Sequence, residues 1–122
     1  MARILLIDDD EQLRGMMIQM LTADGHQVSV AADGEEGLEM SKTLNPELIL
    51  TDVLMPKMDG IEMIMELQKI HLNIPIIAMS GGRRAVSAEF NLESATLVGV
   101  KATLSKPFTR SELRVAIEKA LH

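Results

Sequence analysis

"ILLIDDD" occupies residues 4–10 and joins an apolar run to three consecutive carboxylates. A short apolar run of this kind is typical of a strand buried in a parallel sheet. Two carboxylates about 4 Å apart repel each other by on the order of 4 kcal/mol at an effective dielectric constant near 20. Crowding them therefore requires a compensating cation or solvent, and we expect a cation where this strand ends.

Similar apolar runs recur along the chain and alternate with helix-like stretches. The predicted strands are Arg3–Ile7, Gln27–Ala31, Leu48–Thr51, Pro75–Met79 and Lys101–Leu104. Helices are predicted after the first strand, at Gly34–Leu44, Gly60–Ile70 and Ser87–Val98, and at the end of the chain. Parallel strands need crossover connections, which are usually helical. The pattern predicts an α/β fold, a (βα)₅ doubly wound parallel sheet covered on both faces.

Two of these helices have the clearest signals. The first shows a spacing of i, i+3, i+4, i+7 and i+8, which predicts one buried face made of Leu13, Met16, Met17, Met20 and Leu21. Asp10 can cap its start. The last repeats the pattern with Leu113, Ala116, Ile117, Ala120 and Leu121, and Thr109 with Glu112 forms a capping-box sequence before it.

Length and composition exclude several classes of protein. The 122 residues, 47% of them apolar, predict a single domain over residues 1–122. There is no cysteine, so neither a disulfide nor a thiolate site is available. No apolar stretch is long enough for a signal peptide or a membrane span, and we expect a cytoplasmic protein that binds no membrane. A net charge of −6 and the absence of Trp and Tyr argue against a nucleic-acid partner.

Polar residues gather where the predicted strands end, which is where ligands bind to open α/β sheets. They are the acidic run Asp8–Asp10, Asp52, Ser80 and Lys106. Each has an ordinary alternative as a helix start, a turn residue or a solvated charge. Together, the carboxylates suit a hard cation such as Mg²⁺. Lys106 and Ser80 add a positive charge and a hydrogen-bond donor, so the sequence predicts a phosphoryl-binding site.

Four fragments resemble the landmarks of the response regulator receiver family: "ILLIDDD", "LILTDVLMPKMDG", "IPIIAMSGG" and "VKATLSKPF". The resemblance covers essentially the whole chain. It implies a flavodoxin-like sheet with strand order 2-1-3-4-5. Asp52 matches the carboxylate that accepts a phosphoryl group from a histidine kinase or a histidine phosphotransfer protein. The resemblance further implies that Asp8, Asp9, Asp52 and the backbone carbonyl of Leu54 hold Mg²⁺.

The other landmarks match the phosphoryl-binding part of a receiver site. Ser80, with Gly81 beside it, and Lys106 would contact the phosphoryl oxygens, and the Lys106–Pro107 bond is commonly cis in this family. Such a domain is no enzyme beyond catalysing its own phosphorylation and dephosphorylation. Phosphorylation would shift a pre-existing equilibrium and so change the surface offered to a downstream protein. The chain would be a stand-alone receiver or one excised from a longer protein.

Some positions depart from the usual receiver pattern. Thr103 stands where many receivers carry an aromatic switch residue, so rotation of an aromatic ring cannot operate there. Leu54 replaces a polar side chain that orients the hydrolytic water in some receivers, which predicts slow self-dephosphorylation. The spacing from Ser80 to Lys106 is 106 − 80 = 26 residues, a few more than usual. Gly82, Arg83 and Arg84 in this stretch fit either an anion contact or a solvated loop.

Two rival hypotheses remain from the sequence. A haloacid-dehalogenase-like phosphatase would also place an Asp-x-Asp pair after its first strand, with Asp8 as the nucleophile. Gln12 is unusual for that family, and the run after Asp52 would be unexplained. The other rival is a receiver-like interaction module that is never phosphorylated. Substitution of Asp52 or Asp8 by Asn distinguishes the phosphatase from the receiver.

Overall fold

A computed structural model describes residues 2–53, 60–70, 73–80 and 100–122. Its five strands are β1 (Arg3–Ile7), β2 (Gln27–Ala31), β3 (Leu48–Asp52), β4 (Ile76–Ser80) and β5 (Ala102–Ser105). All neighbouring pairs are parallel, and the strand order is β2-β1-β3-β4-β5. This is the predicted doubly wound sheet with its order 2-1-3-4-5.

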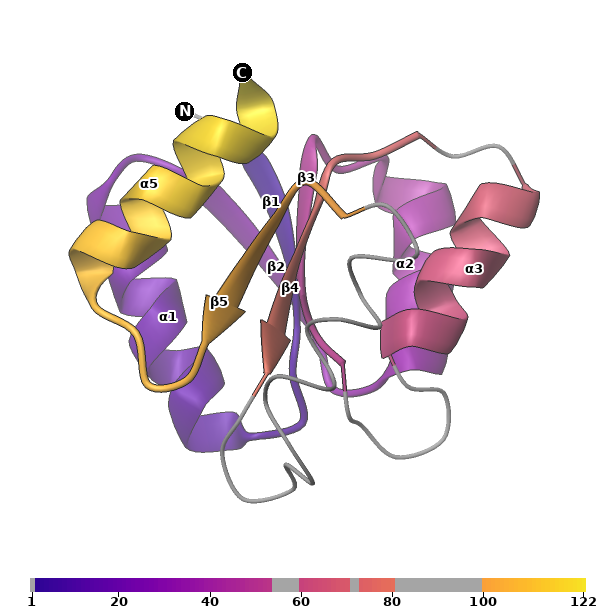
Figure 1. Cartoon of the computed structure of the whole chain (residues 1–122). Coiled ribbons are helices and arrows are strands. Elements are labelled where there is room, and N and C mark those ends of the chain that lie inside the picture. Colours follow the sequence, from indigo (N-terminus) through magenta and orange to yellow (C-terminus); the bar gives the residue numbers. More distant parts are fainter. Residues whose placement is uncertain (1, 54–59, 71–72, 81–99) are drawn as a thin grey trace.

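Helices cover both faces of the sheet. The described helices are α1 (Glu11–Ala23), α2 (Gly34–Leu44), α3 (Gly60–Lys69) and α5 (Arg110–Leu121). Figure 1 shows α1 and α5 on one side of the sheet and α2 and α3 on the other. The helix predicted at Ser87–Val98 lies outside the described residues. None of the helices in the described ranges has both the length and the apolar content needed to cross a membrane.

The predicted strand bounds hold to within one residue. β1 and β2 are confirmed as predicted, β3 extends one residue further to include Asp52, and β4 and β5 each lie one residue later than predicted. Pairing decides these ends, because Asp52 is in register with Met79, and Ser80 with Ser105. Strands β3 and β4 therefore carry Asp52 and Ser80 as their last residues and not in the loops beyond them.

Side chains alternate across the sheet and form two apolar clusters. On the face of α1 and α5, Ile4, Leu6, Leu48, Leu50, Ile77 and Met79 pack with residues of both helices. On the face of α2 and α3, Leu5, Ile7 and Ile49 pack with Met63, Ile64 and Leu67. Strands β1, β3 and β4 are thus apolar on both faces, which explains why they read as continuous apolar runs.

The buried face of α1 is rotated relative to the prediction, because it includes Ile18 and leaves out Met16. Met17 and Leu21 are fully buried, and Leu13 and Met20 pack at the edge of the cluster. Met16 is 48% exposed, so its assignment to the core stripe is wrong. One residue turns an α-helix by about 100°, which places Met16 well away from the line through Met17 and Leu21.

Helix α2 lies unusually close to β1 at Gly37. A Cβ atom at this position would lie 2.5 Å from Cδ1 of Ile7 and 3.2 Å from Sδ of Met63. A Cβ atom would force the end of the Ile7 side chain to shift, so the space between helix and strand favours glycine here. One turn later, the buried hydroxyl of Ser41 donates a 2.7 Å hydrogen bond to the Gly37 carbonyl. The Ser41 hydroxyl is therefore buried with its hydrogen bond satisfied.

Candidate functional site

The candidate site lies at the carboxyl ends of four strands. Asp8 directly follows β1, Asp52 and Ser80 are the last residues of β3 and β4, and Lys106 directly follows β5. The backbone N–H of Asp8 donates to the Ala31 carbonyl and extends the β1–β2 ladder by one bond. Strand pairing therefore carries these four side chains to one edge of the sheet, as the sequence predicted.

Carboxylate oxygens of Asp8, Asp9 and Asp52 lie within 4.8 Å of one another. The Asp8 side chain is fully buried, that of Asp52 is 9% exposed, and Asp9 is half-buried. Three carboxylate oxygens at this separation fit a hard divalent cation, because Mg²⁺ is usually bound by a few carboxylates together with water and phosphate oxygens. The donors present thus fit Mg²⁺ chemically.

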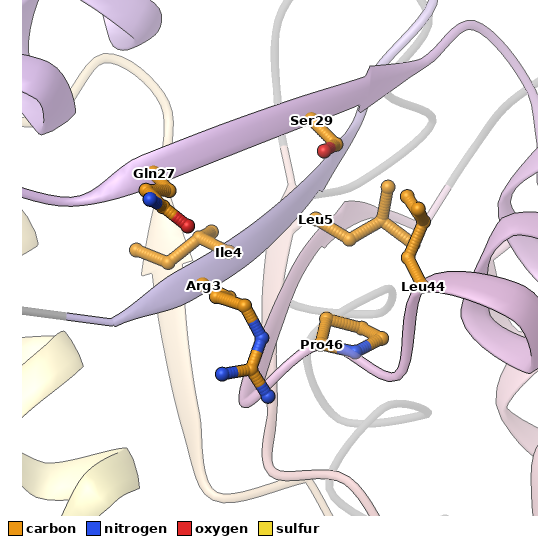
Figure 2. Close-up of a pocket in the computed structure, with 7 residues that line it drawn as sticks. All are labelled: Arg3, Ile4, Leu5, Gln27, Ser29, Leu44 and Pro46. Carbon is orange, nitrogen blue, oxygen red and sulfur yellow. The ribbon is translucent and has the colours of Figure 1, made fainter.

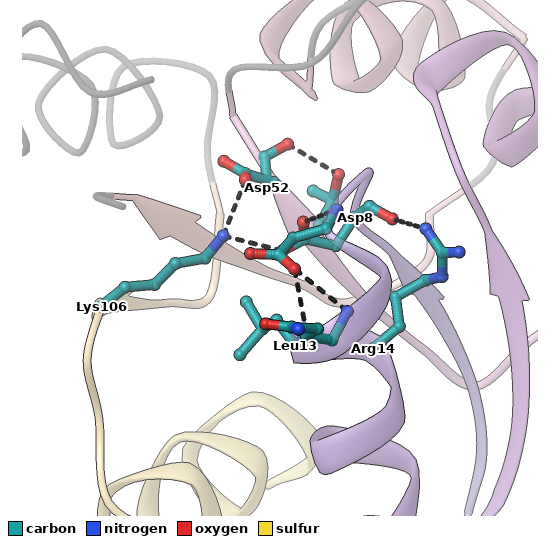
Figure 3. A network of polar contacts seen from close by, with 8 residues as sticks. Asp8, Leu13, Arg14, Asp52 and Lys106 are labelled. Atoms are coloured by element: carbon teal, nitrogen blue, oxygen red, sulfur yellow. Dashed lines mark hydrogen bonds and ion pairs between the residues drawn. The ribbon is translucent and has the colours of Figure 1, made fainter. Parts of the chain in front are cut away.

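Lys106 links two of these carboxylates. Its Nζ donates to Oδ2 of Asp8 and to Oδ2 of Asp52, both at 2.7 Å, as Figure 3 shows. Burial acts to lower the pKa of Lys106, but the hydrogen bonds and charges of Asp52 and Asp8 outweigh it and raise that pKa above its ordinary value of 10.5. Lys106 is therefore positively charged at neutral pH, and the three carboxylates and Lys106 together carry a formal charge of −2, the sum of −3 and +1.

Asp10 has a structural role beside the cluster. Its Oδ1 accepts hydrogen bonds from the backbone N–H groups of Gln12 and Leu13, at 3.1 and 3.2 Å. This confirms Asp10 as the N-cap of α1. Asp10 thus caps a helix, whereas Asp8 and Asp9 belong to the acidic cluster.

Ser80 brings a hydroxyl to the same edge. Its side chain is fully buried, and within the described ranges its Oγ has no hydrogen-bond partner. Buried hydroxyl groups normally have a hydrogen-bond partner, and a buried hydroxyl without one often has a functional role. The arrangement leaves Ser80 able to donate to an oxygen that enters the site.

The structure does not describe every predicted site residue. Leu54, Gly81 and the neighbouring stretch with Gly82, Arg83 and Arg84 lie outside the described residues. Thr103 is exposed on β5 and pairs in register with Ala78, before the strand ends that carry the site. The Lys106–Pro107 bond is cis, as the family resemblance implied.

Arg14, which was not predicted as a site residue, contacts the backbone of the acidic run. Its Nη1 donates a 2.6 Å hydrogen bond to the backbone carbonyl of Asp8, as Figure 3 shows. The signal was present in the spacing, since side chains on a helix tilt toward its N-terminus. A long cation in the second turn of α1 can therefore reach back to the acidic run.

An apolar pocket adjoins the site. Its volume is about 250 Å³, and it is lined by Asp10, Leu13, Met16, Lys106, Pro107 and Phe108. Met16, which the sequence analysis placed in the core, thus forms part of an exposed surface next to Lys106.

A further pocket, of about 220 Å³, lies at the opposite end of β1 (Figure 2). Figure 2 shows Arg3 beside Ile4, Leu5 and Pro46 there. The Arg3 side chain donates to the Asn45 carbonyl at 3.2 Å and pairs with Glu47 at 3.5 Å. This pocket therefore shares no residue with the acidic cluster.

Comparisons with known proteins agree with the geometry. The family model described as "Response regulator receiver domain" matches residues 4–118. Chemotaxis protein CheY of Thermotoga maritima is 35% identical over 119 residues, which cover 96% of this chain and 95% of that protein. Alkaline phosphatase synthesis transcriptional regulatory protein PhoP of Bacillus subtilis is 33% identical over 98% of this chain, but the chain spans only 48% of its length.

Solved structures give the same result. A response regulator receiver domain protein from Clostridium thermocellum has a TM-score of 0.87 at 30% identity, and the match covers 99% of this chain and 94% of that one. NtrX from Brucella abortus has a TM-score of 0.88 at 27% identity, with 98% of this chain and 26% of that chain covered.

Proposed function

The chain belongs to the response regulator receiver domain family, whose members are signalling domains of two-component systems, and we propose that it accepts a phosphoryl group on Asp52. The observation that carries this proposal is the pairing of Asp52 with Lys106 at 2.7 Å beside two further carboxylates. A carboxylate with a fixed cation at one side and a cation-binding cluster at the other is suited to phosphoryl transfer.

The proposed donor is a phosphohistidine on a histidine kinase or a histidine phosphotransfer protein. A carboxylate oxygen of Asp52 forms a bond to phosphorus while the phosphorus–nitrogen bond breaks, and the electron pair of that bond returns to the imidazole. Lys106 balances the charge that remains on the phosphoryl oxygens. The unpaired hydroxyl of Ser80 then donates to one of these oxygens, which supplies the hydrogen bond that Ser80 lacks in the described structure.

Asp8, Asp9 and Asp52 would hold Mg²⁺, together with the carbonyl of Leu54 as the family resemblance implies. When bound, the ion neutralises the charge that develops on the transferred group. The charge of −2 on the three carboxylates and Lys106 supports a divalent ion. We further propose that the whole chain acts as one receiver domain and that slow self-dephosphorylation follows from Leu54.

The geometry disfavours Asp8 as a phosphatase nucleophile. The Asp8 side chain is fully buried, and its two oxygens accept hydrogen bonds from Asp10 N–H at 2.9 Å and from Lys106 Nζ at 2.7 Å. Asp52 retains some exposure. A donor can therefore reach Asp52 more directly than Asp8, and the apolar pocket beside Lys106 offers it adjoining surface.

Incubation with acetyl phosphate and MgCl₂, followed by intact mass spectrometry, tests the proposal. We expect the wild type to gain the mass of one phosphoryl group and Asp52→Asn to gain none. Asp33→Asn is a matched control, because Asp33 caps α2 and lies outside the acidic cluster. Labelling of Asp52→Asn, or loss of labelling only in Asp8→Asn, would overturn the proposal, and an unlabelled wild type would support a module that is never phosphorylated.

A further inference from the structure

Arg14 holds the chain on both sides of Asp9. Its side chain donates from Nη1 to the Asp8 carbonyl at 2.6 Å, and its backbone N–H donates to the Asp10 carbonyl at 2.9 Å. Asp9 is the residue between these two carbonyls. A single residue of α1 thus fixes the segment that presents one of the three clustered carboxylates.

The contact between Arg14 and the Asp8 carbonyl orients the backbone that leads into Asp9. That oxygen belongs to the peptide group that joins Asp8 to Asp9, and a peptide group is planar. Fixing the oxygen therefore fixes the orientation of the bond between the Asp9 nitrogen and its Cα. A hydrogen bond from an ionised donor is about twice as strong as one between neutral groups, so a guanidinium is well suited to this task.

The other hydrogen bonds of Asp8 do not involve its backbone carbonyl. The Asp8 N–H donates to Ala31 O at 3.1 Å, Oδ1 accepts from Asp10 N–H, and Oδ2 accepts from Lys106. These bonds fix the strand end and the Asp8 carboxylate. In the described part of the chain, the hydrogen bond from Arg14 is the contact that acts on the Asp8 carbonyl.

We propose that Arg14 is a positioning residue for the divalent cation, because it orients the Asp8–Asp9 peptide so that the Asp9 carboxylate faces those of Asp8 and Asp52. The inference rests on the cation site of the proposed function. Arg14 touches neither the cation nor the phosphoryl group in this account. Its effect on cation binding passes through the backbone.

The charge of Arg14 alone would have the opposite effect. A cation near three carboxylates weakens their attraction for a second cation, so neutralising Arg14 would tighten Mg²⁺ binding if only its charge mattered. Loss of positioning would weaken Mg²⁺ binding. The sign of the change in affinity therefore separates the two roles.

Isothermal titration of the metal-free protein with MgCl₂ tests the proposal, with Arg14→Gln, Arg14→Lys and wild type compared well below their melting temperatures. We expect Arg14→Gln to bind Mg²⁺ roughly tenfold or more weakly, as is typical when a residue that orients a metal ligand is lost. Arg14→Lys, which keeps the charge and a donor, should recover part of the affinity. Amide NMR shifts of Asp9 and Asp10 should move in metal-free Arg14→Gln.

Arg3→Gln is the matched control, since Arg3 also donates to a backbone carbonyl and lies at the other end of β1. It should bind Mg²⁺ like the wild type. Unchanged or tighter binding by Arg14→Gln while the wild type binds Mg²⁺ would overturn the inference and leave the proposed function intact. A wild type that does not bind Mg²⁺ would overturn the cation site and the inference with it. If Arg14→Gln does not fold, Arg14→Met takes its place, with unchanged or tighter Mg²⁺ binding as the overturning result.

Discussion

The backbone N–H of Lys106 donates a 2.7 Å hydrogen bond to the carbonyl of Ser80. The two residues are 26 positions apart in the sequence, 106 − 80, yet adjacent strands bring them to the same edge. Their side chains differ in one respect: the ammonium of Lys106 has two carboxylate partners, whereas the hydroxyl of Ser80 has none in the described ranges. This difference leads to the first two predictions.

Ser80→Ala should make the unphosphorylated protein more stable. A buried hydroxyl without a partner costs about 1 kcal/mol or more in desolvation, and alanine removes that cost. We expect the free energy of unfolding to rise by about 0.5 to 1 kcal/mol in urea titrations followed by circular dichroism. Ser41→Ala is the matched control, because the equally buried Ser41 hydroxyl donates to Gly37. Its loss should cost about 1 kcal/mol, and a similar loss in Ser80→Ala would contradict the prediction.

Lys106→Met should destabilise the protein in the presence of EDTA by about 3 kcal/mol, because removing one partner of a buried ion pair leaves the other charges uncompensated. Added MgCl₂ should restore part of this loss, since a bound cation replaces the missing positive charge. Urea titrations with and without MgCl₂ measure both effects. The exposed Lys101, substituted in the same way, should change the free energy of unfolding by no more than about 0.5 kcal/mol. An equal response to MgCl₂ in wild type and Lys106→Met would be inconsistent with this account.

Asp24 should make stability depend on pH in the acid range. It follows α1 and accepts hydrogen bonds from Arg114 at 2.8 and 3.0 Å and from Arg110 at 2.6 Å. The hydrogen bonds from Arg114 and then Arg110 hold the pKa of Asp24 well below its ordinary value of 3.8. A carboxylate whose pKa is lowered by folding contributes stability above its unfolded-state pKa, and this contribution is lost as the pH falls toward the folded-state value.

The difference in unfolding free energy between wild type and Asp24→Asn should therefore be constant above about pH 5 and shrink below about pH 4. Urea titrations at several pH values measure it. Glu118→Gln removes a negative charge from α5, beside the same surface pocket as Asp24, and serves as the control for net charge. A difference that stays constant down to about pH 3 would show that the ion pairs do not contribute.

Gly37→Ala should destabilise the contact between α2 and β1 by about 1 to 2 kcal/mol, because the new Cβ meets Ile7. Ile7→Val removes Cδ1, the atom that lies closest. The double variant should therefore be more stable than the sum of the single changes by about 1 kcal/mol. Gly15→Ala is the control, since nothing lies within 4 Å of its Cβ, and it should gain about 0.5 to 1 kcal/mol from helix propensity. Strict additivity at Gly37 and Ile7 would argue against the clash.

Most of the fold could be predicted because its signals are local. Apolar runs marked the strands to within one residue, and capping residues marked the starts of helices at Asp10 and Thr109. The rule that parallel strands end at one edge then sufficed to bring Asp8, Asp52 and Lys106 together.

The errors and omissions involve contacts that periodicity does not determine. Met16 fits the apolar spacing of α1, but only the packing angle of the helix decides that it is 48% exposed. The hydrogen bonds that Asp24 accepts from Arg110 and Arg114 join residues that are 86 and 90 positions apart. No pattern within one helix specifies such a partner, although two arginines at i and i+4 indicate a shared helix face.

The register of Ser80 with Ser105 has a consequence for the evolution of this chain. The ladder between β4 and β5, and not the length of the intervening segment, sets the distance from the hydroxyl to the ammonium. Insertions and deletions between these strands can therefore accumulate without dismantling the chemistry, so that segment offers a place where new specificity can arise while the reacting groups stay in position.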